Sequence, residues 1–330
     1  MKIFIVTDAY YPQTNGVVTT MSNVINCLQQ MGHIIKVISP NDVKTLPFKP
    51  YPDVQLASFC YNYISSQLDQ FKPDMIHIVT EFSLGIQASI ACKNKKLSYT
   101  TSYHTKFPEY MSQHWHIPSF LGYQLLKAFH NSGDKTLVAT KSLYQHLQQK
   151  GFKNLVLWNR GVDTNIFRPL PPNIHTVRPN LFYIGRVSYE KNIEAFLSID
   201  IPGTKWVVGD GPAKNKLQKK YPNVIFTGNK YNTELAQMYS NADVTVFPSL
   251  TDTFGMVILE SLACGTPVAA FPVTGPIDII QDGITGGLGQ NLKEAIYKAM
   301  LCKRHNCIEY AKKHTWMHCT DTFINNLIKV

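Results

Sequence analysis

Residues 244–260 read VTVFPSLTDTFGMVILE, and this stretch decides the fold. An apolar, β-branched run ends at Phe247, a polar turn follows, and the next residues predict a helix that begins near Gly255. A strand that passes through a short loop into a helix is half of a β–α–β unit, from which parallel sheets are built. The same succession recurs along the whole chain of 330 residues. We therefore expect an α/β protein.

Outward from this stretch, strand-like and helix-like segments alternate in both halves. Strands are expected at residues 181–185, 205–208, 224–227, 244–247 and 268–271 in the second half, and at 2–7, 34–39, 75–78, 98–102, 136–139 and 155–158 in the first. The first helix is expected over about residues 17–31, because Gly32 is a typical helix-ending residue. The pattern predicts two doubly wound, Rossmann-like domains with a cleft between them.

Four prolines within residues 168–179 interrupt the alternation. Proline can continue neither a helix nor a central strand, so we expect a linker at residues 169–179. The first domain is then residues 1–168 and the second is residues 180–314. A final amphipathic segment, residues 315–330, is predicted to be a helix that packs back on the first domain.

The bulk composition limits the cellular setting. Seven cysteines at scattered positions are typical of reduced thiols, so we expect a cytoplasmic protein. The Cys and His residues at 302–319 lack the paired ligand spacing of a zinc site, so no metal is expected. The net charge of +10 is spread in short clusters. Those clusters are either solvated helix faces or a surface for phosphates and anionic membranes, and no nucleic-acid reading module accompanies them.

Two acids in the opening stretch are candidate ligand-binding groups. Asp252 lies in the loop after the strand, and Glu260 lies about one and a half turns into the helix. The free amides at the helix start and the helix dipole favour an anion such as a diphosphate there. Asp252 could then bind sugar hydroxyls, and Glu260 could bind a ribose diol. The alternative is an ordinary N-cap at Asp252 and an exposed Glu260.

Other candidates follow the ends of other strands. Arg186 and Lys191 share the loop after residues 181–185 and suit phosphate oxygens, although solvated cations are the alternative. Gly16 would allow close backbone approach to a ligand after the first strand. His104 follows a strand in the first domain and is either structural or catalytic. The turn Gly209–Pro212 lacks the third glycine of a dinucleotide fingerprint and is interpreted as structural.

In order, these segments resemble the retaining GT-B glycosyltransferases of family four, especially the α-mannosyltransferase-like and sulfoquinovosyltransferase-like members. The resemblance is carried by residues 7–18, 102–105, 159–163, 167–169, 185–192, 208–212, 251–255 and 260–268. It covers nearly the whole chain. One difference is that Asp252 stands where the family's first motif acid is usually a glutamate.

The resemblance implies a role for each candidate. Arg186 and Lys191 would bind the donor diphosphate, Glu260 the ribose, and Asp252 the donor sugar. Phe254 and Gly255 would complete the donor site. Gly16 would lie near the phosphates and the acceptor, and His104 near the reacting centre. These assignments give a catalytic set of His104, Asp252, Arg186 and Lys191.

The implied reaction is front-face transfer of a hexose from a nucleotide sugar to a lipid or glycan acceptor, without metal or cofactor. GDP-mannose is the first expectation for the donor and a UDP-sugar the second. The protein would be cytoplasmic or peripheral on the inner membrane face. The alternatives are a nucleotide-sugar epimerase of the same architecture and a non-catalytic nucleotide-sugar-binding protein.

Overall fold

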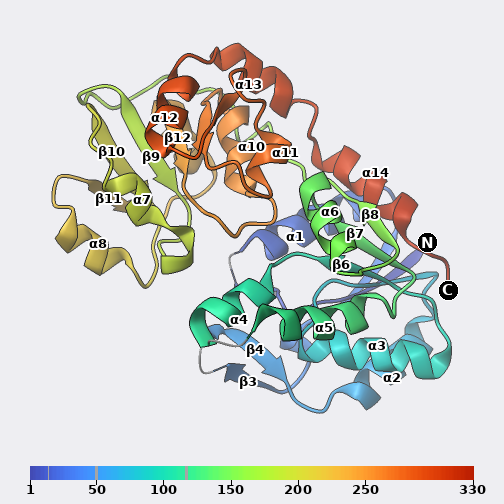
Figure 1. Ribbon diagram of the computed structural model, residues 1–330. Coiled ribbons are helices and arrows are strands. Elements are labelled where there is room, and N and C mark those ends of the chain that lie inside the picture. Colours follow the sequence, from blue (N-terminus) through green and yellow to red (C-terminus); the bar gives the residue numbers. More distant parts are fainter. Residues whose placement is uncertain (14, 49–50, 116–117) are drawn as a thin grey trace. The chain divides into compact units, whose positions relative to one another are not determined.

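The computed structural model describes residues 1–13, 15–48, 51–115 and 118–330, and the chain divides into two compact units (Figure 1). The first unit comprises Met1–Arg160 and Trp316–Val330, and the second comprises Gly161–Thr315. The expected linker, residues 169–179, is therefore part of the second unit, together with residues 161–168, which we expected in the first domain. Hydrogen bonds explain this difference. The Leu170 amide donates to Ser240 Oγ at 3.0 Å, and the Asn173 amide donates to Asn241 Oδ1 at 2.9 Å.

The first unit is built on a six-stranded parallel sheet with the order β2-β1-β5-β6-β7-β8. Its strands are β1 (Lys2–Val6), β2 (Ile34–Ile38), β5 (Met75–Ile78), β6 (Thr100–Tyr103), β7 (Lys135–Val138) and β8 (Leu155–Leu157). Its helices are α1 (Gly16–Gln30), α2 (Tyr61–Phe71), α3 (Ser83–Lys95), α4 (Phe107–Trp115), α5 (Ser119–His130), α6 (Lys141–Gln149) and α14 (Trp316–Asn326), with a 3-10 turn at Pro40–Asp42. The predicted strands of this half are confirmed to within about two residues.

An antiparallel hairpin in the first unit was not predicted. It consists of β3 (Thr45–Phe48) and β4 (Tyr51–Ala57). Three prolines lie within residues 47–52, and proline argues against a strand because it cannot donate to the ladder. An isolated two-stranded ladder with edges on both sides tolerates such residues, and this explains why the sequence pattern failed here.

The second unit contains a six-stranded parallel sheet with the order β11-β10-β9-β12-β13-β14. Its strands are β9 (Asn180–Ile184), β10 (Thr204–Val208), β11 (Ile225–Gly228), β12 (Val244–Phe247), β13 (Val268–Ala270) and β14 (Gly286–Leu288). Its helices are α7 (Ile193–Leu197), α8 (Lys214–Lys220), α9 (Asn232–Asn241), α10 (Met256–Ala263), α11 (Pro276–Ile279), α12 (Leu292–Met300) and α13 (Arg304–Ala311), with a 3-10 turn at Tyr189–Lys191. This strand order is that of the dinucleotide-binding fold. From β9 the strands follow one another towards one edge of the sheet up to β11, and from β12 they follow one another towards the opposite edge, so the strand order reverses between the neighbouring parallel strands β9 and β12.

The C-terminal helix α14 belongs to the first unit and packs beside α1 (Figure 1). The indole nitrogen of the fully buried Trp158 donates to the main-chain oxygen of Cys319 at 3.1 Å. The Trp158 ring also packs against Phe323, with ring centroids 5.0 Å apart. Within the described residues, no helix combines the length and the apolar character that a membrane span requires.

Candidate functional site

Two loops meet where the strand order of the second sheet reverses. One follows β9 and carries Arg186 and Lys191, and the other follows β12 and carries Asp252. In open α/β sheets this reversal point is where ligands bind. The ammonium of Lys191 lies 2.6 Å from Asp252 Oδ1, and Asn192 Nδ2 donates to the Pro248 carbonyl at 3.1 Å. The structure thus brings the predicted cation and the predicted acid into direct contact.

The Lys191–Asp252 pair is largely withdrawn from solvent, with side chains 22% and 19% exposed. The second oxygen of Asp252 is buried and has no hydrogen-bond partner among the described residues, and the same holds for Ser249 Oγ and Thr251 Oγ1. Unsatisfied buried polar atoms are costly and uncommon, so a group of three in one loop requires an explanation. We interpret this loop as a place where a ligand or ordered water completes the hydrogen bonding.

Arg186 lies on the same loop as Lys191 and is exposed to solvent. The phenol of Tyr183 donates to the main-chain oxygen of Arg186 at 2.6 Å, which fixes the start of this loop to the sheet. The structure therefore places Arg186 at the reversal point of the sheet, with its main chain held and its side chain at the surface.

The start of α10 is open. Gly255 is the N-cap residue, has φ of +93°, and supplies no side-chain cap, and the first turn contains no acid. Its neighbour Phe254 is buried. The helix therefore presents its first amides without a capping carboxylate, as an anion-binding helix start requires.

Glu260 forms a second polar contact of this unit. Its Oε2 accepts a hydrogen bond from the Tyr239 phenol at 2.8 Å. Burial raises the pKa of Glu260 to about 7, and the hydrogen bond from Tyr239 acts in the opposite direction. Glu260 lies five residues beyond Gly255, about 7.5 Å along the helix axis. Tyr239 was not predicted, because an aromatic residue at helical spacing is usually a core residue.

The turn Gly209–Pro212 packs closely against the start of the loop that carries Arg186 and Lys191. Gly209 has φ of +141°, and a Cβ there would lie 1.9 Å from the Gly185 carbonyl oxygen. Gly211 has φ of +154°, and a Cβ there would lie 2.4 Å from the Val187 carbonyl oxygen. The interpretation of this turn as structural is therefore supported, and its glycines allow the close backbone contact that positions the neighbouring loop.

Gly16 begins α1 in the first unit, and Asn15 is its N-cap. The Asn15 side-chain oxygen accepts hydrogen bonds from the amides of Val17 and Val18, each at 3.0 Å. Asn15 therefore already satisfies two of the amides at the start of this helix, and those two are not left for a ligand. Thr14, which the sequence motif also includes, lies outside the described residues.

His104 directly follows β6, and both of its ring nitrogens have partners. Nε2 lies 2.8 Å from Ser102 Oγ, and Nδ1 lies 3.4 Å from the Arg160 guanidinium. Since a guanidinium can only donate, Nδ1 accepts and the ring proton lies on Nε2. Burial, and then the charge of Arg160, lower the pKa of His104 well below its usual range. His104 is therefore held as a neutral imidazole of fixed tautomer, and Arg160, which was not predicted, fixes it.

Two carboxyl groups lie at the corresponding reversal point of the first sheet, between β1 and β5. Asp8 accepts hydrogen bonds from Leu84 N, Gly85 N and two hydroxyl groups, and so it caps α3. Glu81 is buried, and burial raises its pKa to about 8, with the nearby Asp8 adding to the effect. Neither acid was singled out from the sequence, because each is an isolated acid in a loop.

We expect Glu81→Gln to make the protein more resistant to alkaline pH. A carboxyl group whose folded pKa lies near 8 stabilises the fold fully below its unfolded pKa of about 4.3, and this contribution is lost as the pH rises towards 8. At pH 8.5 the variant should therefore melt at least about 3 °C above the native chain, with a smaller difference at pH 5.5. Thermal unfolding at both pH values measures this. An equal Tm difference at the two pH values would contradict the buried, neutral state of Glu81.

All seven cysteines are free thiols. In the second unit, Cys302 and Cys307 donate to the main-chain oxygens of Gly286 and Thr285. Cys319 belongs to the first unit and donates to the main-chain oxygen of Asn159 in that same unit. In the ranges that the structure describes, no group of three or more His, Cys, Asp or Glu side chains is arranged to hold a metal. The Cys and His residues of 302–319 are therefore divided between separate packing environments.

The chain is similar in sequence to several characterised transferases. A GDP-mannose-dependent alpha-mannosyltransferase of Corynebacterium glutamicum is 28% identical over 316 residues, which cover 87% of this chain and 76% of that protein. The sulfoquinovosyl transferase SQD2 of Arabidopsis thaliana is 29% identical, with 84% and 61% covered. An alpha-monoglucosyldiacylglycerol synthase of Streptococcus pneumoniae is 29% identical, with 91% and 78% covered.

The fold has close counterparts among solved structures. The sucrose-phosphate synthase of Thermosynechococcus elongatus superposes with a TM-score of 0.76 at 19% identity, over 98% of this chain and 97% of that one. Residues 14–166 match the family model described as Glycosyltransferase Family 4, and residues 171–314 match that of Glycosyl transferases group 1. The two family matches follow each other along the chain, and they agree with the two parallel sheets and with the loops at their reversal points. The chain therefore belongs to the GT-B glycosyltransferases of family 4.

Proposed function

We propose that the protein is a retaining hexosyltransferase that moves a hexose, with mannose from GDP-mannose as the first candidate, to a lipid or glycan acceptor. The observation that carries the proposal is the Lys191–Asp252 pair at the reversal point of the second sheet. Two named relatives support the choice of substrates. One is a GDP-mannose-dependent alpha-mannosyltransferase, and the other is an alpha-monoglucosyldiacylglycerol synthase.

In this proposal the donor diphosphate replaces Asp252 as the partner of Lys191. Phosphate oxygens also take hydrogen bonds from Arg186 and from the open amides at the start of α10, beside Phe254 and Gly255. Asp252, released from Lys191, then accepts from hydroxyl groups of the donor sugar. Glu260 accepts from the ribose.

The transfer step breaks the bond between C1 of the donor sugar and the diphosphate oxygen. The acceptor oxygen forms its bond to C1 on the same face, and its proton passes to the departing diphosphate. Arg186, Lys191 and the helix amides stabilise the charge that develops there, so positioning and preorganised electrostatics supply the catalysis and no metal is needed. We assign the neutral His104 to the donor sugar near the reacting carbon, and Gly16 to the phosphate and acceptor side.

The net charge of +10 suits a protein that meets its acceptor at an anionic membrane surface, peripherally and from the cytoplasmic side. The acceptor is then a lipid headgroup or a lipid-linked glycan. Binding of this kind weakens with salt, because it depends on screened surface charge.

Labelled donors test the proposal. The purified protein is incubated with radiolabelled GDP-mannose or UDP-glucose, with and without phospholipid vesicles that contain diacylglycerol and phosphatidylinositol. We expect nucleotide release that depends on the acceptor, together with a labelled lipid product. Interconversion of the donor sugar would mean an epimerase, and binding without release would mean a nucleotide-sugar-binding protein. Either result would contradict the proposed transfer.

A further inference from the structure

Tyr239 is the side chain that contacts the carboxylate of Glu260. It projects from α9, is fully buried, and donates its phenol proton to Glu260 Oε2 at 2.8 Å. In the described part of the chain this hydrogen bond engages Oε2 of Glu260, and it leaves Oε1 for another donor. A carboxylate fixed through one oxygen presents the other in a defined direction.

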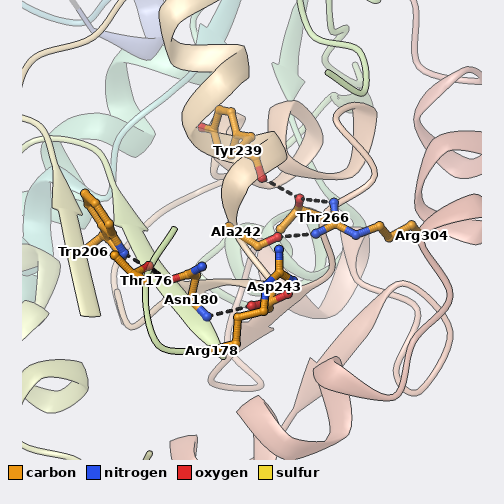
Figure 2. A network of polar contacts seen from close by, with 9 residues as sticks. All are labelled: Thr176, Arg178, Asn180, Trp206, Tyr239, Ala242, Asp243, Thr266 and Arg304. Atoms are coloured by element: carbon orange, nitrogen blue, oxygen red, sulfur yellow. Dashed lines mark hydrogen bonds and ion pairs between the residues drawn. The ribbon is translucent and has the colours of Figure 1, made fainter. Parts of the chain in front are cut away.

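Tyr239 itself is held at both ends. Its main-chain oxygen accepts a hydrogen bond from Thr266 Oγ1 at 2.6 Å, and Thr266 Oγ1 in turn accepts one from Arg304 at 3.3 Å. Figure 2 shows this chain of contacts from Arg304 through Thr266 to the main-chain oxygen of Tyr239. The ring also packs edge-on against Phe167, with centroids 6.0 Å apart. The phenol therefore has little freedom to move away from Glu260.

We propose that Tyr239 is a positioning residue for nucleotide recognition, which fixes Glu260 through Oε2 so that Oε1 meets the ribose diol. The inference rests on the proposed function, because it takes Glu260 as the ribose-binding acid. In this inference Tyr239 does not touch the ligand. It acts through Glu260, so its effect on affinity depends on the hydroxyl groups of the ribose.

The consequence is a specific pattern of affinities. Without the phenol, the Glu260 carboxylate loses its anchor and can turn away from the ribose. A hydrogen bond between a fixed carboxylate and a hydroxyl group is among the stronger ones, so its loss weakens binding of a ribonucleotide about 10-fold. A deoxynucleotide that lacks the hydroxyl group cannot make this bond, so its affinity should not change.

The test compares GDP with 2′-deoxy-GDP and 3′-deoxy-GDP, and UDP with its 2′-deoxy form, by isothermal titration. We expect the native chain to prefer at least one ribonucleotide about 10-fold over its deoxy form. In Tyr239→Phe this preference should fall towards one, with deoxynucleotide affinity kept. Tyr99→Phe, which removes another buried phenol that contacts Ser132 at 2.7 Å in the first unit, is the control and should retain the native preference.

Two outcomes overturn the inference. Equal weakening of ribonucleotide and deoxynucleotide in Tyr239→Phe would mean a merely structural role, and an unchanged preference would mean that Tyr239 does not act on Glu260. Failure of the proposed function is seen separately. The native chain would then bind none of these nucleotides, or Glu260→Gln would keep the native preference, so that Glu260 does not contact the ribose. Circular dichroism shows that each variant is folded, and Phe retains the ring that packs on Phe167.

Discussion

In Lys191→Ala, the rate of sugar transfer is expected to fall at least a hundredfold while the protein keeps its fold. A hundredfold loss corresponds to about 2.7 kcal/mol of transition-state stabilisation, a reasonable share for a charge that binds the leaving diphosphate. The fold should persist because the Lys191 side chain belongs to a loop after β9 and is not part of the hydrophobic core. Steady-state kinetics with saturating donor measure the loss, and circular dichroism measures the fold.

The matched control is Lys298→Ala. Lys298 also forms an ion pair, with Asp282 at 2.9 Å in the second unit, but both side chains are more than two-fifths exposed and lie away from the reversal point of the sheet. Its removal should change the transfer rate less than twofold, because exposed ion pairs contribute little. Near-native turnover in Lys191→Ala, or an equal loss in both variants, would contradict the phosphate role of Lys191.

Gly209→Ala is expected to lower the stability of the second unit by at least about 3 kcal/mol and to abolish nucleotide binding. Its new Cβ would lie 1.9 Å from the Gly185 oxygen, and this is a backbone atom that cannot rotate away. The residue also has φ of +141°, which alanine rarely adopts. Relief of the clash requires the loop of Arg186 and Lys191 to move, so stability and binding should be lost together.

Gly283→Ala separates the effect of the positive φ from the effect of the backbone clash. Gly283 also has a positive φ, of +75°, but a Cβ there would meet nothing within 4 Å. It should therefore cost only about 1 kcal/mol from backbone strain and leave nucleotide binding intact. Thermal unfolding and titration with GDP or UDP compare the two variants. A similar loss in both would show that the close contact between Gly209 and Gly185 is unimportant.

Much of the second unit could be predicted from local patterns. Apolar runs such as 244–247 are buried on both faces because the sheet is parallel and covered by helices, and such runs are easily recognised. Lys191 and Asp252 lie 61 residues apart in the sequence, and their contact follows from strand order. Once each loop is assigned to a strand end, the reversal of strand order between β9 and β12 brings the two loops together.

Other features depend on tertiary contacts that no local pattern carries. The effect of Tyr239 comes from the contact of α9 with α10, and that of Arg160 from its contact with His104. Residues 169–179 have a linker's composition, yet hydrogen bonds to Ser240 and Asn241 attach them to the second unit. Asn15 is different, because asparagine directly before a predicted helix is a common N-cap, so the sequence itself indicates its role.

The central claim is that Lys191 and Glu260 bind two parts of one nucleotide diphosphate. Titration of GDP, GMP and guanosine, and of the uridine series, into the native chain, Lys191→Ala and Glu260→Gln tests it most directly. We expect the native chain to bind one diphosphate much more tightly than its nucleoside. We also expect Lys191→Ala to remove this advantage, and Glu260→Gln to weaken the diphosphate and the nucleoside by the same factor. If the diphosphate and the nucleoside bind the native chain equally, or if Lys191→Ala keeps the native difference, Lys191 does not bind the diphosphate.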